Sequence, residues 1–89
     1  MKLNDKKIVD KTIGDMIKHM RVTEGLSQKT LGEKINKTES TISVYELEKS
    51  SFPFTSFHNI AKTCDFEILL YDKDTEEIFR IIDSKKDKK

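Results

Sequence analysis

The sequence predicts a mainly α chain of one domain, in which four short helices are followed by a C-terminal β-hairpin. The 89-residue chain is too short to enclose two separate hydrophobic cores. Before residue 65, apolar side chains recur at the three- and four-residue spacing of helices. After residue 65, two runs rich in β-branched and aromatic residues, 66–71 and 78–82, flank a polar segment typical of a turn.

Composition limits the class of protein. Only 35% of the residues are hydrophobic and 37% are charged, so a lone monomer would be marginal and a partner subunit is expected. The single cysteine, Cys64, excludes an internal disulfide and fits a reducing compartment. The sequence shows neither a signal peptide nor a run of about 20 apolar residues. We therefore expect a soluble, cytoplasmic protein without a membrane partner.

Positive charge is concentrated in the first two thirds of the chain. Residues 1–63 carry eleven basic and eight acidic side chains, a net charge of +3, whereas residues 64–89 carry six and eight, a net charge of −2. A surface that faces phosphates is therefore expected before residue 64.

The first two helices have recognisable ends. Thr12 followed by Asp15 resembles a capping box, and Gly25 is a natural stop for the first helix. Ser27 can cap the second helix, which we expect to run to about Ile35.

A very short turn leads into the third helix. Asn36 can take the left-handed conformation that ends a helix, and Thr38 can cap the next one. Two short helices joined so closely must cross steeply. After a loop over residues 49–54, Thr55 or Ser56 is expected to cap the fourth helix.

The third helix has two different faces. Ile42, Tyr45 and Glu46 share one face and are expected to turn inward. The opposite face is mostly small and polar, and it carries Glu39, Ser40, Ser43, Val44 and Leu47.

The segment from Leu26 to Glu46 resembles the helix-turn-helix of the XRE family, which includes the lambdoid phage repressors and Cro. The resemblance covers roughly residues 12–64 and depends on Leu-Ser-Gln at 26–28, the small Gly32, Ser-Thr-Ile-Ser at 40–43 and Glu46, all in register. It implies a four-helix, lambda-repressor-like domain in which the third helix enters the major groove of DNA and the second crosses the backbone.

The resemblance also implies which residues contact DNA. Gln28 would lie against a phosphate, and Lys37 and Lys49 would contact phosphates at the two ends of the third helix. Glu39 has two possible roles, since its carboxylate can accept from a cytosine amino group or stabilise the positive end of the helix dipole. The complete set is Gln28, Lys37, Thr38, Glu39, Ser40, Thr41, Ser43, Val44 and Lys49.

Three further positions are interpreted through the family. Arg21 and Glu46 occupy positions that in family members form a buried ion pair. Glu48 departs from the family, because a glycine commonly ends the third helix there. The shape of the loop up to Pro53 therefore stays open.

The C-terminal hairpin is expected to form the dimer interface. Both of its faces are apolar, and a lone two-stranded hairpin is marginal in water. It resembles the arrangement in HipB-type antitoxins, whose C-terminal strands pair across the dimer. The expected interface residues are Phe66, Ile68, Leu70, Tyr71, Ile78, Phe79, Ile81 and Ile82.

These interpretations divide the chain into four parts. We expect a flexible arm at residues 1–11, a DNA-binding domain at 12–64, a dimerisation hairpin at 65–83 and a disordered basic tail at 84–89. The hypothesis is a sequence-specific regulator of double-stranded DNA, a homodimeric repressor that acts on a palindromic operator. Two alternatives stay open: an antitoxin that neutralises a partner toxin and regulates its own operon, and a protein-interaction module that does not bind DNA.

No pattern in the sequence indicates an enzyme. His19 and His58 are far apart and have no cysteine or carboxylate at ligand spacing, so we expect no metal, no cofactor and no catalytic base. Cys64 follows the apolar spacing of the fourth helix and is expected in the core.

Overall fold

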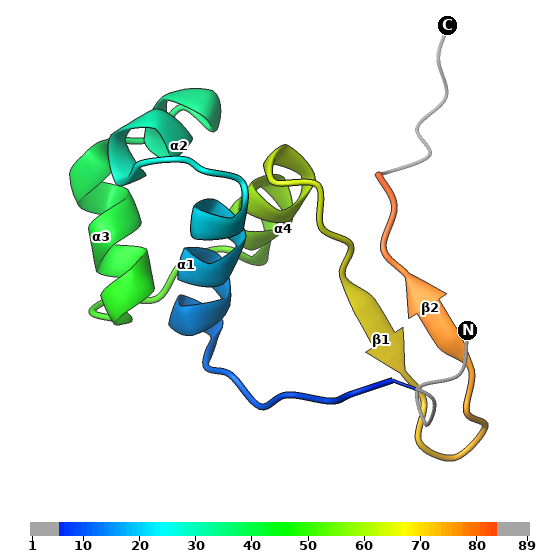
Figure 1. Cartoon of the computed structure of the whole chain (residues 1–89). Helices are drawn as coiled ribbons and strands as arrows, with labels where there is room; N and C mark the ends of the chain where they lie inside the picture. The colour runs from blue at the N-terminus through cyan, green and yellow to red at the C-terminus, as the bar shows by residue number, and fades with distance from the viewer. Residues whose placement is uncertain (1–5, 84–89) are drawn as a thin grey trace, which may run out of the picture.

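The computed structural model describes residues 6–83 and confirms the predicted fold class. The elements are α1 (Ile13–Thr23), α2 (Gln28–Lys34), α3 (Glu39–Leu47), α4 (Phe54–Thr63), β1 (Leu69–Tyr71) and β2 (Ile78–Arg80). The four helices form one body, and the hairpin stands beside it next to α4 (Figure 1). No helix within residues 6–83 is long and apolar enough to cross a membrane.

The ends of the chain correspond only partly to the predicted arm and tail. Residues 6–11 form neither helix nor strand and lead into α1. The first five residues of the predicted arm, and the basic tail predicted at 84–89, lie outside the described residues.

Hydroxyl caps start the first three helices, as the sequence predicts. The side chains of Thr12, Ser27 and Thr38 accept hydrogen bonds from the backbone N–H three residues later, at 3.1, 3.0 and 3.1 Å. Each such cap stabilises a helix by about 1 kcal/mol. Gly25 and Asn36 follow α1 and α2 with left-handed φ values of 78° and 65°, so both turns are tight.

The start of α4 differs from the prediction. Neither Thr55 nor Ser56 caps this helix, which begins at Phe54 after Pro53 and has no side-chain cap. The ring of Pro53 holds φ at −68°, a value already suited to a helix start. Ser56 is instead buried within the first turn, where its backbone N–H donates to the Pro53 carbonyl at 3.0 Å.

The hydrophobic core lies where the four helices meet. Every helix contributes at least one fully buried side chain, and the aromatic ring of Phe52 packs against Tyr45 from the loop before α4, with ring centroids 4.6 Å apart. The buried residues are Ile17, Met20, Leu31, Ile42, Tyr45, Ile60, Ala61 and Cys64.

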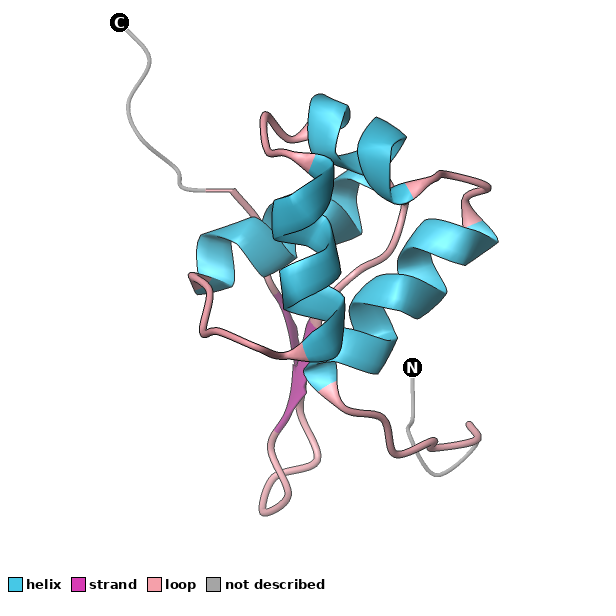
Figure 2. Cartoon of the chain, turned by 90° about the vertical axis from the view of Figure 1, so that its left-hand side faces the viewer, coloured by secondary structure: helices cyan, strands magenta, loops and turns pink. Residues whose placement is uncertain are grey.

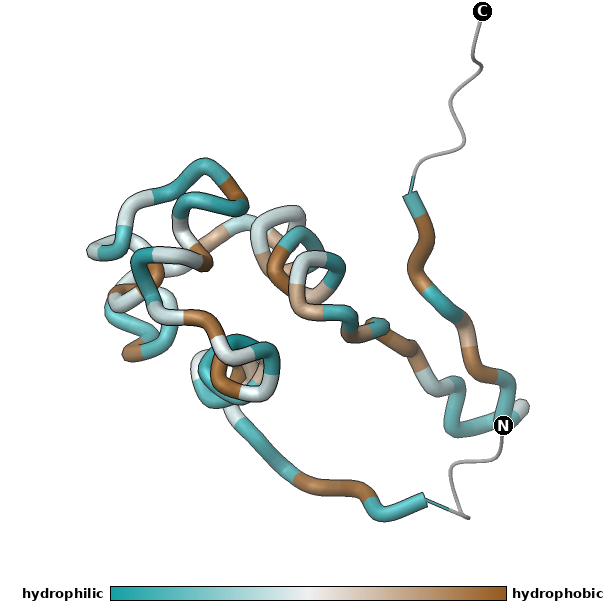
Figure 3. Tube along the Cα trace, turned by 45° about the horizontal axis from the view of Figure 1, so that its top comes forward, coloured by the Kyte–Doolittle hydropathy of each residue, from teal (hydrophilic) through white to brown (hydrophobic). Residues whose placement is uncertain are grey.

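The hairpin is shorter than predicted. Leu70 pairs with Phe79 at the centre of the antiparallel ladder, which contains only three residues in each strand. Phe66 and Ile68 precede β1 and pack against the helical core, and the Ile68 carbonyl still accepts the backbone N–H of Ile81 at 3.2 Å. The turn of the hairpin extends beyond the helices (Figure 2), and hydrophobic residues occupy both of its strands (Figure 3).

Local polar contacts order the hairpin turn. The carboxylate of Asp72 accepts backbone hydrogen bonds from Asp74 at 2.9 Å and Thr75 at 3.3 Å. These bonds lower the pKa of Asp72 below its ordinary value. Beyond β2, Asp83 pairs with Lys62 of α4 at 2.8 Å, which lowers the pKa of Asp83 and connects the end of the hairpin to the helical body.

Candidate nucleic-acid interface

The turn between α2 and α3 is made possible by a residue without a side chain. A Cβ atom at Gly32 would lie 2.6 Å from the carbonyl oxygen of Lys37, much closer than real Cβ contacts. The backbone N–H of Lys37 also donates to the Gly32 carbonyl at 2.7 Å. The start of α3 therefore packs directly on the end of α2, and the two helices cross steeply.

α3 buries one face and exposes the other. Ile42 and Tyr45 lie in the core, whereas Glu39 and Ser40 are exposed and Val44 is half-buried. A shallow hollow of about 540 Å³ runs along the outward face. It is lined by Gln28, Thr38, Glu39, Ser40, Ser43, Val44, Leu47 and Lys49.

This hollow brings together seven of the nine residues predicted to contact DNA. Lys37 and Thr41 do not line it. Lys37 is exposed in the turn between the helices. Thr41 is half-buried, and its hydroxyl oxygen forms a hydrogen bond with the Thr38 hydroxyl oxygen at 2.9 Å. Leu47, which was not among the predicted contacts, adds an exposed apolar side chain to the hollow.

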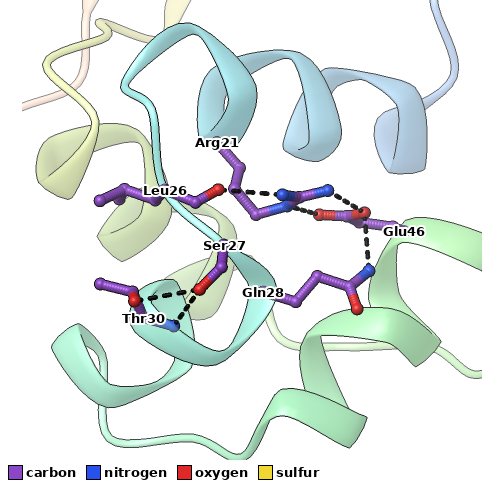
Figure 4. Close-up of polar contacts among 6 residues, drawn as sticks. All are labelled: Arg21, Leu26, Ser27, Gln28, Thr30 and Glu46. Atoms are coloured by element: carbon purple, nitrogen blue, oxygen red, sulfur yellow. Dashed lines mark hydrogen bonds and ion pairs between the residues drawn. The ribbon is translucent and has the colours of Figure 1, made fainter.

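Behind the hollow, a buried ion pair joins α1 to α3. Arg21 Nε donates to Glu46 Oε2 at 2.6 Å and Arg21 Nη2 donates to Glu46 Oε1 at 3.1 Å (Figure 4). Only 12% of the Arg21 side chain and 6% of the Glu46 side chain are exposed. The remaining guanidinium edge reaches the chain before α2, where Arg21 Nη1 donates to the Leu26 carbonyl at 2.9 Å.

Gln28 connects this ion pair to the hollow. Its amide Nε2 donates to Glu46 Oε1 at 3.1 Å, whereas the sequence analysis predicted only a phosphate contact for this residue. An amide nitrogen carries two hydrogens. The bond to Glu46 fixes the orientation of the side chain and leaves the second hydrogen for an acceptor at the surface.

The contact made by Glu48 was also not predicted from the sequence. Glu48, which ends α3 with a left-handed φ of 57°, accepts a hydrogen bond from the backbone N–H of Gly14 at 2.6 Å. A Cβ atom at Gly14 would lie 2.3 Å from the Glu46 carbonyl oxygen. A glutamate at position 48, where the family commonly has glycine, indicates an unusual helix end. Its partner Gly14 lies 34 residues away, so no local sequence pattern predicts the contact.

Comparison with known proteins places this arrangement in a family. A family described as Helix-turn-helix matches residues 17–69, more than half of the chain. The chain therefore belongs to the helix-turn-helix family. No curated protein matches it.

Two solved structures resemble most of this helix-turn-helix protein. They are described as complexes of HipB, one of a single-residue variant with an O2 20mer and the other with an O4 20mer, each with a TM-score of 0.61 and 27% sequence identity. Each match covers 78% of this chain, and 97% and 99% of the respective HipB chains. The similarity thus extends over almost the full length of those chains.

The histidines and the cysteine of this helix-turn-helix protein have packing roles. His19 lies edge-on to Phe66 and His58 stacks on Phe54, with ring centroids 5.9 and 6.3 Å apart. Burial, reinforced by the nearby carboxylate of Glu24, raises the pKa of the Cys64 thiol. The thiol therefore stays protonated near neutral pH and is a poor nucleophile.

The ion pair should control folding stability. Replacing Arg21 or Glu46 alone with alanine leaves its partner as an unpaired, largely buried charge, and should cost about 3–5 kcal/mol of unfolding free energy. Replacing both together with Met and Leu should cost less. The matched control is Arg80→Ala, whose pair with Glu67 is about 60% exposed on each side and should contribute less than about 1 kcal/mol. Urea titration measures all four variants, and an unchanged midpoint for either buried single variant would refute the role of the pair.

Proposed function

We propose that this helix-turn-helix protein is a sequence-specific double-stranded DNA-binding regulator that acts as a homodimeric transcriptional repressor. The observation that carries the proposal is the outward face of α3. That face is hollowed and mostly small and polar, with Val44 and Leu47 as its apolar members, while the inward face is held by Ile42, Tyr45 and the buried Glu46. A helix held in this way can enter a major groove with its outer side chains toward the base edges.

The basic side chains of the segment from α2 to the end of α3 suit a polyanion. Lys29, Lys34, Lys37 and Lys49 are all exposed on or between α2 and α3 and at the end of α3. Three exposed carboxylates in the same segment, Glu33, Glu39 and Glu48, partly offset this positive charge. We assign the phosphate contacts to the lysines at the ends of α3 and to the free amide hydrogen of Gln28.

We assign the base contacts to the residues in the middle of the hollow. The Ser40 and Ser43 hydroxyls can donate to or accept from bases, and Val44 can rest on a thymine methyl group. The hydroxyls of Thr38 and Thr41 already form a hydrogen bond to each other at the start of α3. We therefore assign these two residues to phosphate contacts and not to base contacts. Glu39 lies in the first turn of α3, a position that fits both base reading and stabilisation by the helix dipole.

The hairpin is the proposed dimer interface. Leu70 and Phe79 are paired across its strands on one face, and they are 66% and 48% exposed. Tyr71 and Ile82 are exposed on the other face. Both strands have an open edge, so a second subunit can cover the faces, the edges or both. A two-fold dimer would place two α3 helices about 34–36 Å apart, on successive turns of a palindromic operator.

The HipB similarity favours a second candidate within the same class. An antitoxin of the HipB type would neutralise a partner toxin and regulate its own operon. Co-purification with the product of a neighbouring gene, followed by inhibition of that gene product, would support this candidate.

DNA binding should be salt-dependent and sequence-specific. On a duplex carrying the region upstream of its own gene, the logarithm of the binding constant should fall steeply with the logarithm of salt concentration. Ser40→Ala and Val44→Ala should each reduce discrimination by about 1–3 kcal/mol, while Lys49→Ala should weaken all sequences alike. Thr23→Ala, exposed at the end of α1, serves as the control. A flat salt dependence in fluorescence anisotropy would contradict the proposal and favour a protein-interaction module.

Dimerisation should depend on the exposed face of the hairpin. Leu70→Lys combined with Phe79→Lys should give a folded monomer, because neither side chain belongs to the core. Val22→Lys is the matched control, since Val22 is 57% exposed on α1. Sedimentation equilibrium measures the molecular mass in solution and so distinguishes monomer from dimer. Undiminished dimerisation of the double variant would move the interface to the apolar hollow of about 380 Å³ around Ile13, Phe52, Phe54 and Phe57.

A further inference from the structure

The end of α3 is built around an unfavourable backbone conformation. Glu48 lies in the left-handed region with φ 57°, ψ 37°, where a side chain crowds the backbone and glycine is preferred. Its backbone N–H donates to the Tyr45 carbonyl at 3.1 Å, and Lys49 N–H donates to the Val44 carbonyl at the same distance. This cap could be made by glycine, so the carboxylate must contribute something else.

The carboxylate of Glu48 reaches the beginning of α1. It accepts the N–H of Gly14 at 2.6 Å, one of the amides that have no partner within the helix. The hydroxyl of Thr12 accepts a hydrogen bond from the N–H of Asp15, so Thr12 and Glu48 cap different backbone amides of α1. The positive end of the α1 dipole also favours a carboxylate at this point. Gly14 permits the contact, because a Cβ atom there would also meet the Glu48 side chain at 2.8 Å.

This contact lies next to the basic end of the hollow on α3. Lys49 lines that hollow and also a second one of about 580 Å³, whose lining includes Lys11, Thr12, Glu48 and Ser50. Lys49 thus stands between α3 and the start of α1. Glu48, the residue before Lys49, is bonded to Gly14 of α1 through its carboxylate.

We propose that Glu48 is a positioning residue for DNA binding: by capping α1 across the fold it fixes the end of α3 and holds Lys49 toward the phosphate backbone. This inference rests on the proposed function. Simple electrostatics makes the opposite prediction, since removal of a carboxylate beside a phosphate-binding lysine should tighten DNA binding. Loss of the Glu48 carboxylate should therefore weaken DNA binding if the residue positions Lys49, and tighten it if the carboxylate only repels phosphate.

The test compares three substitutions at one position on the full chain. Glu48→Gly keeps the left-handed backbone without strain but loses the bond to Gly14, and it should weaken binding to the upstream duplex by about 3–10-fold. Its log–log salt slope should also fall in magnitude by about one, because one phosphate contact is lost. Glu48→Gln keeps an acceptor of the same length and should restore most of the affinity. Glu48→Asn, which tolerates the left-handed region but is shorter, should behave like Glu48→Gly.

The matched control is Glu76→Gly in the hairpin turn. Glu76 is also a glutamate with a left-handed φ, here 67°, and it is exposed, so this change removes the same charge and the same backbone strain away from α1. It should leave affinity and salt slope unchanged. Wild-type or tighter binding by Glu48→Gly, or unfolding of both the Gly and Asn variants, would overturn the positioning role. Failure of the unmodified protein to bind any duplex would instead overturn the proposed function.

Discussion

The helix-turn-helix depends on one buried carboxylate. Glu46 accepts hydrogen bonds from two nitrogens of Arg21 and from the amide of Gln28, so a side chain of α3 is bonded to α1 and to the start of α2 at once. A buried charge is costly unless its partners satisfy it, and the geometry that satisfies this one exists only when the three helices have their observed angles. The hydrogen bonding of this one carboxylate therefore depends on the observed arrangement of α1, α2 and α3.

That constraint explains how such a short helix can present a polar surface. α3 has nine residues, and within it Ile42 and Tyr45 are the two residues buried in the core. Its outward face needs no apolar side chains for anchorage, because the ion pair, the close approach at Gly32 and the contact between Glu48 and Gly14 hold it from three directions. Within the hollow, Ser40 and Leu47 are exposed and lie outside the core, whereas Gln28 and Thr38 also form hydrogen bonds within the fold. In the same way, Phe66 and Ile68 pack against the core before β1 begins, while Leu70 and Phe79 stay exposed.

Local signals made much of this fold predictable. The caps at Thr12, Ser27 and Thr38, the left-handed Asn36 and the small Gly32 each act within a few residues, and together they predict the steep crossing and the two faces of α3. The bond between Glu48 and Gly14 could not be predicted, because it joins residues 34 apart that carry no pairing signal. The start of α4 was misjudged because Pro53 can begin a helix through its fixed φ, without a hydroxyl cap. The strands are shorter than predicted, because apolar and aromatic runs do not show where the regular ladder begins and ends.

We propose that the outward face of α3, positioned by the buried ion pair, is the surface that meets DNA. The most direct test is an amide NMR titration of the isotope-labelled protein with the upstream duplex. Binding through this face should give the largest shift changes at residues 27–29 and 38–49, with small changes in β1 and β2. Changes confined to the hairpin or to the hollow around Phe52 and Phe57, with α3 unaffected, would contradict it.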